Sequence, residues 1–372
     1  MIVSAEDLAV VGDVVRRFGE HVETTLFGAE GPDGDLGAVP KLLRETADMD
    51  LLADPNPGNA GHDAGVWGRH ALESGAALSL VTLSTLAETC AGFAAAVHAQ
   101  GIGCLALDGE SAEGAIVGAA FMPPLGIPLD ERTAPDVCRV QEDGTLHGTA
   151  HFVTSAGAPE SLACFARAGD GWALATVGAD AEGVRVQDVG ARVGVRAMTQ
   201  SHITFDRAAA TVLRRGPAAS DLLRRVVACD WLGQATIAAG AARRALRDAQ
   251  TYAEGRYQGG SIIVEHAAVR LLLAHARHDV EVMTSVLGAR AHEPLATIDA
   301  TALLRWAISA RLCIGEHARR AVTSSLQVLG GYGYMDDYGQ SKRLRDVSAL
   351  ASMHGGRDQL LLLLQDLAKD AR

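Results

Sequence analysis

The stretch SSLQVLGGYGY, residues 324–334, reads as the end of a helix that runs into closely spaced glycines. Gly330, Gly331 and Gly333 carry no Cβ, so their backbone can adopt turns that other residues avoid and can approach a ligand closely. A second helix is expected after the turn at Asp336–Asp337, and it should end at another glycine pair. Two helix ends that meet at glycines form a niche for a phosphate-bearing cofactor, although an ordinary helical hairpin with glycine caps gives the same pattern.

The chain has 372 residues, is 48% hydrophobic, carries a formal net charge of −12 and contains six cysteines. The negative charge argues against nucleic acid as a partner, because contacts to phosphates need a basic surface. No basic N-terminal segment precedes an apolar run, and no apolar run is long enough to span a membrane. The cysteines are scattered without a Cys-x-x-Cys pair, as is typical of free thiols in a reducing compartment. We therefore expect a cytoplasmic protein.

The periodicity of apolar residues divides the chain into three parts. Spacings of three and four predict helices from Ser4 to about Leu107, and short β-type runs follow from about Ala115 to Leu213. Long helical patterns return after Pro217 and suit an up-and-down bundle. We predict an α+β fold with an N-terminal helical domain (1–112), a small antiparallel β domain (113–216) and a C-terminal four-helix-bundle-type domain (217–372). The long C-terminal helices are predicted at 221–255, 264–290, 300–329 and 342–354, with one more after Gly356.

The glycine-rich stretch, the pair Arg345-Asp346 and the sequence MHGG at 353–356 together resemble the C-terminal signature of the acyl-CoA dehydrogenase family. That signature carries Gln, Gly-Gly-Tyr-Gly, Arg-Asp and Glu-Gly-Thr in this order, and His354 stands here at the Glu position. The helical, β, helical order matches over the whole chain. The resemblance implies FAD as cofactor and α,β-dehydrogenation of an acyl-CoA thioester, a reaction of lipid metabolism. It places Gln327, Gly330, Gly331, Gly333 and Gly355 at the cofactor.

A second motif, RYQGG, begins at Arg256 and resembles Arg-x-Gln-Phe-Gly of the family, with glycine in place of the Phe. The family Arg reaches the pyrophosphate of FAD in a neighbouring subunit, and a planar guanidinium suits a bridging phosphate. Read alone, Arg256 would be an ordinary surface charge. Because the family supplies the motifs of Arg256 and Gln327 across subunits, the resemblance also implies an oligomer such as a tetramer.

A third motif, FVTS, resembles the family segment that lies against the flavin ring. Phe152 would supply an aromatic face, and Thr154 and Ser155 would supply hydroxyl groups to flavin heteroatoms; a strand with alternating polar residues is the simpler interpretation. The sequence FMPPLGIP at 121–128 stands where the family has Thr-Glu-Pro-x-x-Gly-Ser-Asp. Its polar groups are missing, which weakens the expected contacts to flavin and acyl-CoA.

The family reaction needs a base beside the flavin to remove the α-proton. His354 holds the usual position of that base. Some members place the base on the first bundle helix, where Asp230 aligns, and a carboxylate in such an apolar stretch is costly unless it is paired or functional. Three interpretations stay open: Asp230 is the base, His354 is the base, or this chain has no competent base.

The last interpretation predicts a heterotetramer with a catalytic acyl-CoA dehydrogenase subunit, similar to the paired subunits of bacterial steroid side-chain degradation. An electron-transfer flavoprotein is the expected electron acceptor for a dehydrogenase of this family. Two other functions remain, a flavin-dependent monooxygenase on the same fold and a non-enzymatic scaffold without flavin. No metal site is predicted, because the histidines of the helix expected at 264–290 lack the His-Glu-x-x-His spacing.

Overall fold

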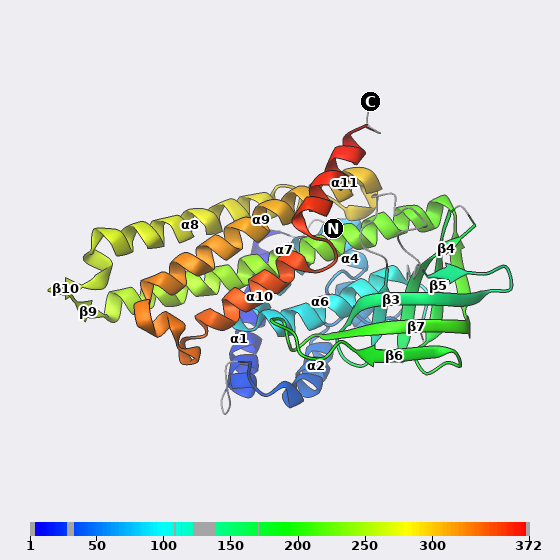
Figure 1. Cartoon of the computed structure of the whole chain (residues 1–372), viewed down its shortest axis with the longest axis horizontal. Helices are drawn as coiled ribbons and strands as arrows, with labels where there is room; N and C mark the ends of the chain where they lie inside the picture. The colour runs from blue at the N-terminus through cyan, green and yellow to red at the C-terminus, as the bar shows by residue number, and fades with distance from the viewer. Residues whose placement is uncertain are drawn as a thin grey trace.

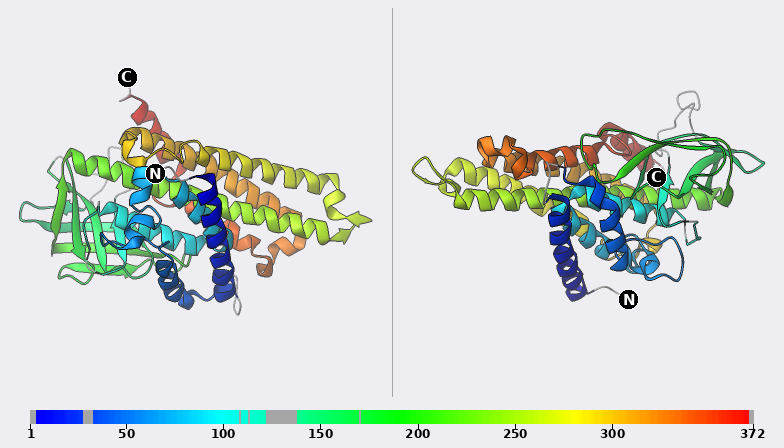
Figure 2. Two further views of the ribbon diagram at one scale, coloured as in Figure 1. Left: turned by 180° about the vertical axis from the view of Figure 1, so that it is seen from behind. Right: turned by 90° about the horizontal axis from the view of Figure 1, so that it is seen from below.

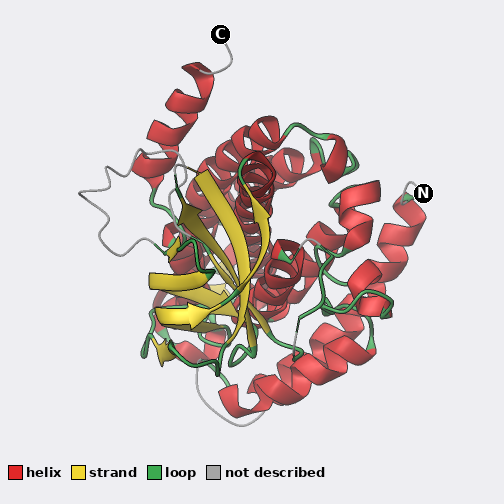
Figure 3. Cartoon of the chain, turned by 90° about the vertical axis from the view of Figure 1, so that its right-hand side faces the viewer, coloured by secondary structure: helices red, strands yellow, loops and turns green. Residues whose placement is uncertain are grey.

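The computed structural model describes residues 4–27, 33–107, 109–112, 114–121, 138–169 and 171–369. Helices come first, an eight-stranded sheet follows, and long helices complete the chain, as predicted. The sheet packs at one end of an elongated helical bundle, and a small hairpin marks the opposite end (Figure 1). Figure 3 looks along the bundle from the sheet end.

The N-terminal part begins with a capped helix. Ser4 and Asp7 exchange hydrogen bonds, with the Asp7 amide donating to Ser4 Oγ at 3.1 Å and the Ser4 amide donating to Asp7 Oδ2 at 2.9 Å. α1 crosses the long helices of the bundle instead of running along them (Figure 2). The break predicted near residues 53–61 is present between α2 and α3. The helices are α1 (Ala5–Phe27), α2 (Val39–Asp48), α3 (Ala60–Ala64), α4 (Arg69–Ser74), α5 (Ala77–Thr89) and α6 (Ala91–Ala106).

The sheet has the order β6-β7-β3-β1-β4-β5-β8, and β2 pairs with both β3 and β4. It is antiparallel except where β1 and β2 run parallel to β4. One side of β3 carries a bulge, because its register against β7 shifts between Ala150 and Val153. The strands are β1 (Val117–Ala120), β2 (Arg139–Val140), β3 (Thr145–Ser155), β4 (Ser161–Ala168), β5 (Gly171–Gly178), β6 (Val184–Asp188), β7 (Thr199–Ala209) and β8 (Thr211–Arg215).

The C-terminal part is organised around α7, which packs against α5, α6, α8, α9 and α10. Small residues let neighbouring helices approach: a Cβ at Gly240 would overlap the backbone carbonyl of Ser84 on α5, and one at Gly233 would overlap the His98 ring on α6. The elements are α7 (Pro217–Gly255), β9 (Tyr257–Gln258), β10 (Ser261–Ile262), α8 (Ala267–Gly288), α9 (Ala300–Val328), α10 (Gln340–Ser352) and α11 (Arg357–Lys369). The predicted borders at 112–113 and 216–217 fall between elements, and the division into three domains stays a prediction.

Candidate functional site

A pocket of about 470 Å³ lies between the sheet and the turn that joins α10 to α11. Phe152 on the β3 bulge and Gln200 on β7 line its sheet side, together with the loop at 189–195. His354 and Gly355 line its helical side. The structure therefore brings together three residues predicted for the site, Phe152, His354 and Gly355. No Asp or Glu side chain is among the described residues that line this pocket. We call it the flavin-side pocket, after the cofactor that the sequence predicts for Phe152 and Gly355.

The two facing residues of the flavin-side pocket have unusual backbones. Phe152 has φ +56° and His354 has φ +49°, which is rare for residues with a Cβ. His354 Nε2 lies 3.2 Å from the Phe152 carbonyl oxygen, so the two segments touch. Each such conformation costs roughly 1–3 kcal/mol and persists only where surrounding contacts enforce it. The surroundings of His354 supply that enforcement.

Asp230 on α7 holds the His354 ring in place from behind. Its Oδ2 lies 2.7 Å from His354 Nδ1 and accepts a hydrogen bond from Gln234 at 2.8 Å. Its Oδ1 lies 3.2 Å from Nε2 of His98 on α6. The carboxylate is 1% exposed and does not line the flavin-side pocket. Asp230 therefore reaches the pocket only through the His354 ring.

Hydrogen bonds also define the proton positions in this buried group. The Trp67 indole N–H donates to His98 Nδ1 at 2.8 Å, so His98 carries its proton on Nε2 and donates to Asp230. Burial acts to raise the pKa of Asp230, but the charge and hydrogen bond of His354 and the hydrogen bond of His98 outweigh it, and the pKa lies below its ordinary value. The Asp230 side chain is therefore an ionised carboxylate.

Arg311 on α9 supplies a buried positive charge to the same group. It is 4% exposed and donates to Gln234 Oε1, which in turn bonds Asp230 through its amide nitrogen. Its other donors reach the carbonyl oxygens of Met353 and Gly355, the latter at 3.2 Å. Burial lowers the pKa of Arg311 to about 10, with the Asp230 charge opposing, so the guanidinium stays charged at neutral pH. Arg311 thus balances Asp230 and fixes the α10–α11 turn.

The other residues predicted on β3 are more enclosed than Phe152. Thr154 is 3% exposed and pairs with Ala119 on one side and Gln200 on the other. Ser155 is 1% exposed, and its hydroxyl donates to the Gly157 carbonyl at 2.6 Å. Their role at a flavin stays a prediction. Of the segment at 121–128, residues 122–128 lie outside the described residues.

The remaining predicted cofactor residues lie at the C-terminal ends of α7 and α9 and in the turn after α9, at the end of the bundle opposite the sheet (Figure 1). Arg256 caps the end of α7, and its guanidinium carbon lies 5.5 Å from the Tyr332 ring centre in the glycine-rich turn. Arg256 Nε is buried without a hydrogen-bond partner. Gln327 is exposed at the end of α9, and the space beside Gly331 is open. Gly330 has φ +57°, and a side chain at Gly333 would overlap the Leu326 carbonyl.

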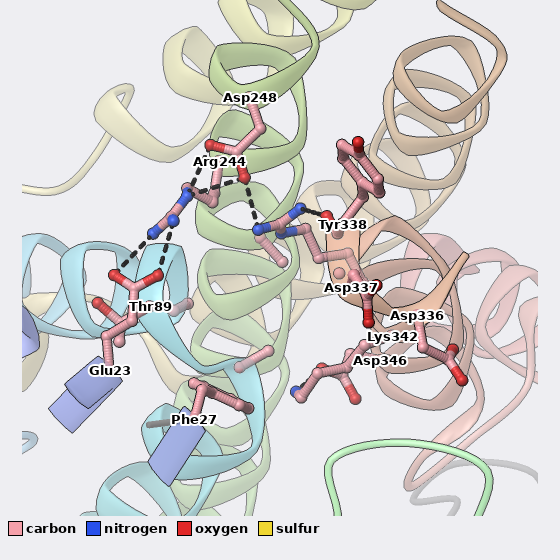
Figure 4. Close-up of a pocket in the computed structure, with 15 residues that line it drawn as sticks. Glu23, Phe27, Thr89, Arg244, Asp248, Asp336, Asp337, Tyr338, Lys342 and Asp346 are labelled. Carbon is pink, nitrogen blue, oxygen red and sulfur yellow. Dashed lines mark hydrogen bonds and ion pairs between the residues drawn. The ribbon is translucent and has the colours of Figure 1, made fainter. Parts of the chain in front are cut away.

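A second cavity of about 470 Å³ lies between α1, α7 and α10 (Figure 4). Arg244 bonds Glu23 at 2.7 Å and Asp248 at 2.8 Å, and Arg343 bonds Asp248 at 2.6 Å. In the same cavity Lys342 bonds Asp346 at 2.6 Å. We call it the ion-pair cavity. Every basic side chain that lines it among the described residues has a carboxylate partner, so it ties three helices together.

Comparison with known proteins agrees with this fold. Residues 232–366 match the family model of the acyl-CoA dehydrogenase C-terminal domain. This match covers the C-terminal helical part of the chain, which belongs to the acyl-CoA dehydrogenase family. It is 27% identical to 3-sulfinopropanoyl-CoA desulfinase of Paraburkholderia xenovorans over 58% of this chain, and 28% identical to benzylmalonyl-CoA dehydrogenase of Aromatoleum aromaticum over 67%.

These matches span 57% and 67% of the two relatives' own lengths. Among solved structures, a variant of the Tcur3481-Tcur3483 steroid ACAD covers 98% of each chain with a TM-score of 0.75 at 22% identity. That likeness establishes the acyl-CoA dehydrogenase fold.

Several residues of the candidate site were missed from the sequence. His98 and Arg311 each interrupt an apolar helical run, a signal that the same argument applied to Asp230 could have used. Arg192, in the loop after β6, carries no such signal.

Among the described residues, no group of three or more His, Cys, Asp or Glu side chains is placed to hold a metal, and no helix is long and apolar enough to cross a membrane.

Proposed function

We propose that the chain is an FAD-dependent, acyl-CoA dehydrogenase-like subunit that completes a flavin site and depends on a partner subunit for the base. The observation that carries this proposal is the state of Asp230. Both of its oxygens are engaged inside the protein, and the described lining of the flavin-side pocket offers no other carboxylate. A carboxylate whose pKa is lowered and whose two oxygens are enclosed and hydrogen-bonded is a weak base that is poorly placed to take a proton from a substrate.

The residues present are compatible with FAD. Phe152 is 48% exposed and offers a ring face at the flavin-side pocket, and Gly355 offers open backbone there. At the other end, the unpartnered Arg256 Nε suits an anionic oxygen, because a buried N–H without an acceptor is costly. When bound, FAD would supply the two-electron oxidation of the acyl chain. The protein would bind and orient the cofactor and exclude water.

The separation of these two sets of residues supports an oligomer. Asp230, which touches His354, and Arg256 are 26 residues apart on the single helix α7, or about 39 Å at 1.5 Å per residue. One cofactor molecule is too short to touch both sets in one chain, so each set would serve a different FAD. Exposed Tyr257, Tyr334 and Met335 surround the Arg256 end, which is a surface composition typical of interfaces.

A heterotetramer fits these features better than a homo-oligomer, because copies of this chain alone would still lack a free carboxylate. The solved relative that carries two chain designations is called a steroid ACAD, which makes an acyl-CoA with a steroid ring system our first candidate substrate. His354 as the base, oriented by Asp230, is the alternative within the same family. An electron-transfer flavoprotein would then reoxidise the enzyme.

The test is to purify the chain alone and together with candidate acyl-CoA dehydrogenase subunits from the same genome. The proposal expects a flavin spectrum only, or mainly, in the co-purified complex, and bleaching of that flavin by acyl-CoA without oxygen. A chain that is yellow alone and bleaches at a normal rate would contradict it. In that case Asp230→Asn and His354→Gln would identify the base. A colourless complex would indicate the scaffold, and flavin that reacts only after reduction and addition of oxygen would indicate the monooxygenase.

A further inference from the structure

Arg192 is the basic side chain of the flavin-side pocket that the sequence did not predict. It lies in the loop between β6 and β7, on the sheet side of the pocket. One terminal nitrogen donates to the Arg196 carbonyl at 3.0 Å. Its Nε and its other terminal nitrogen are shielded from solvent and have no hydrogen-bond partner. A guanidinium with unused donors is an incomplete recognition site, because buried donors are normally paired.

No carboxylate among the described residues neutralises Arg192. Asp188 is near enough to act on its charge, but Asp188 Oδ1 accepts a hydrogen bond from the Gly190 amide at 2.6 Å. Burial lowers the pKa of Arg192, and the positive charge of Arg196 lowers it further. The negative charge of Asp188 acts to raise this pKa. An arginine side chain nevertheless stays protonated in proteins. His354 is the one other ionisable side chain among the described residues that line the pocket.

The loop that carries Arg192 is fixed to the helical domain. The Val195 amide donates to Asp346 at 2.7 Å, and Arg345 Nε donates to the Val193 carbonyl at 3.2 Å. A side chain at Gly194 would overlap the backbone of Arg345, so the loop packs directly against α10. The backbone of the loop that carries Arg192 is therefore fixed against α10 beside the pocket.

We propose that Arg192 is the anion-recognition residue of the flavin-side pocket and donates to anionic atoms of the flavin nucleotide. The inference rests on the proposed function, since it assigns a role toward the same cofactor. Two parts of FAD carry such atoms, the diphosphate and the ring after reduction. In either case the two free donors gain the acceptor that they lack, and a fixed cation meets a negative charge in a partly buried setting.

The experiment compares wild type, Arg192→Gln, Arg192→Lys and the control Arg185→Gln, each in the flavin-binding complex. Arg185 is exposed on β6, so its replacement removes the same charge away from the pocket. FAD affinity is measured by quenching of flavin fluorescence, and the reduction potential by dye equilibration. Circular dichroism and thermal unfolding check that each variant is folded.

We expect Arg192→Gln to weaken FAD binding by about 10- to 100-fold, the range for a hydrogen bond to a charged group, or to make the potential more negative. If the FAD affinity falls and the reduction potential is unchanged, Arg192 donates to the diphosphate. If the reduction potential shifts, Arg192 donates to the reduced ring. Arg192→Lys should recover part of the effect, and Arg185→Gln should show none. If the wild-type complex binds FAD and Arg192→Gln has the same FAD affinity and the same reduction potential, this inference is wrong and the proposed function stands. Wild-type complex that takes no flavin overturns the proposed function and this inference together.

Discussion

The two cavities of about 470 Å³ differ in how their charges are arranged. In the ion-pair cavity, Arg244, Arg343 and Lys342 each meet a carboxylate at 2.6–2.8 Å. In the flavin-side pocket, Arg192 has two unused donors and no carboxylate among the described lining residues. The two cavities therefore have the same volume but differ in whether their basic side chains have carboxylate partners. A cavity in which every cation has a carboxylate partner supports the fold, and one with an unmatched cation is suited to a ligand.

Asp230 extends this contrast behind the flavin-side pocket. It is a carboxylate near the expected site of chemistry, yet it is paired as completely as Asp248 of the ion-pair cavity. Its contacts inside the protein are those of a structural charge. Stability measurements can separate structural from ligand-directed charges, because only structural ones lose favourable contacts when removed from the unliganded protein.

Arg311→Ala should give the largest loss. It leaves Asp230 with less compensating charge and frees the Gln234 and Gly355 acceptors inside the protein. Breaking such a buried arrangement costs about 3–5 kcal/mol in free energy of unfolding. Urea denaturation measures it, with Arg305→Ala, exposed on the same helix, as the control. A loss below about 1 kcal/mol would mean that Arg311 does not support Asp230.

Asp230→Asn should cost about 3 kcal/mol near pH 7, because a buried partner of two histidines loses its charge. The effect should depend on pH. The folded pKa of Asp230 lies below the unfolded value of about 3.9, so the unfolded state binds more protons as pH falls, and the wild-type advantage is present above that value and lost in acid.

The measurement is urea unfolding of both proteins at several pH values between neutral and the acid limit of solubility. Asp221→Asn serves as the control, since Asp221 is an exposed carboxylate near the start of the same helix. A difference between wild type and Asp230→Asn that stays constant into acid would contradict an ionised Asp230 in the folded protein.

The sequence predicted the long helices well because local signals agree there. The helix predicted at 300–329 is α9 at Ala300–Val328, bounded by an Asp299 side chain that caps its start and by glycines after its end. β4 at Ser161–Ala168 has a weaker local signal. Six of its eight residues in a row are buried, so it lacks the alternation that marks a half-exposed strand.

The residues that line the flavin-side pocket were predicted where they carry a motif. Phe152, His354 and Gly355 were found from family-like segments, and the fold brings them to one pocket. The contact between His98 and Asp230 joins positions 132 residues apart, which no local pattern encodes. Arg192 was missed for a related reason: an arginine in a loop is unremarkable until the fold surrounds it and leaves its donors without acceptors.

Arg244→Ala should cost about 2 kcal/mol, less than the buried changes because the side chain is 19% exposed and water can solvate the freed carboxylates. Glu23 and Asp248 both lose a partner, which loosens the attachment of α1 to α7 (Figure 4). Thermal and urea unfolding measure the loss. Arg247→Ala, whose side chain is 53% exposed, is the matched control and should cost well under 1 kcal/mol. Equal losses for the two variants would remove the distinction between the cavity and the surface.

Arg192→Gln should change the free energy of unfolding of the unliganded chain by no more than about 0.5 kcal/mol. The substitution removes one hydrogen bond to the Arg196 carbonyl, but it also removes two buried donors that have no acceptor, and these terms oppose each other. With FAD present in the complex, the same substitution should lower the unfolding temperature relative to wild type. A ligand stabilises the folded protein more when it binds more tightly, and the variant is expected to bind FAD more weakly. A loss in the unliganded chain as large as that of Arg244→Ala would place Arg192 with the structural charges of the ion-pair cavity and would end the contrast between the two.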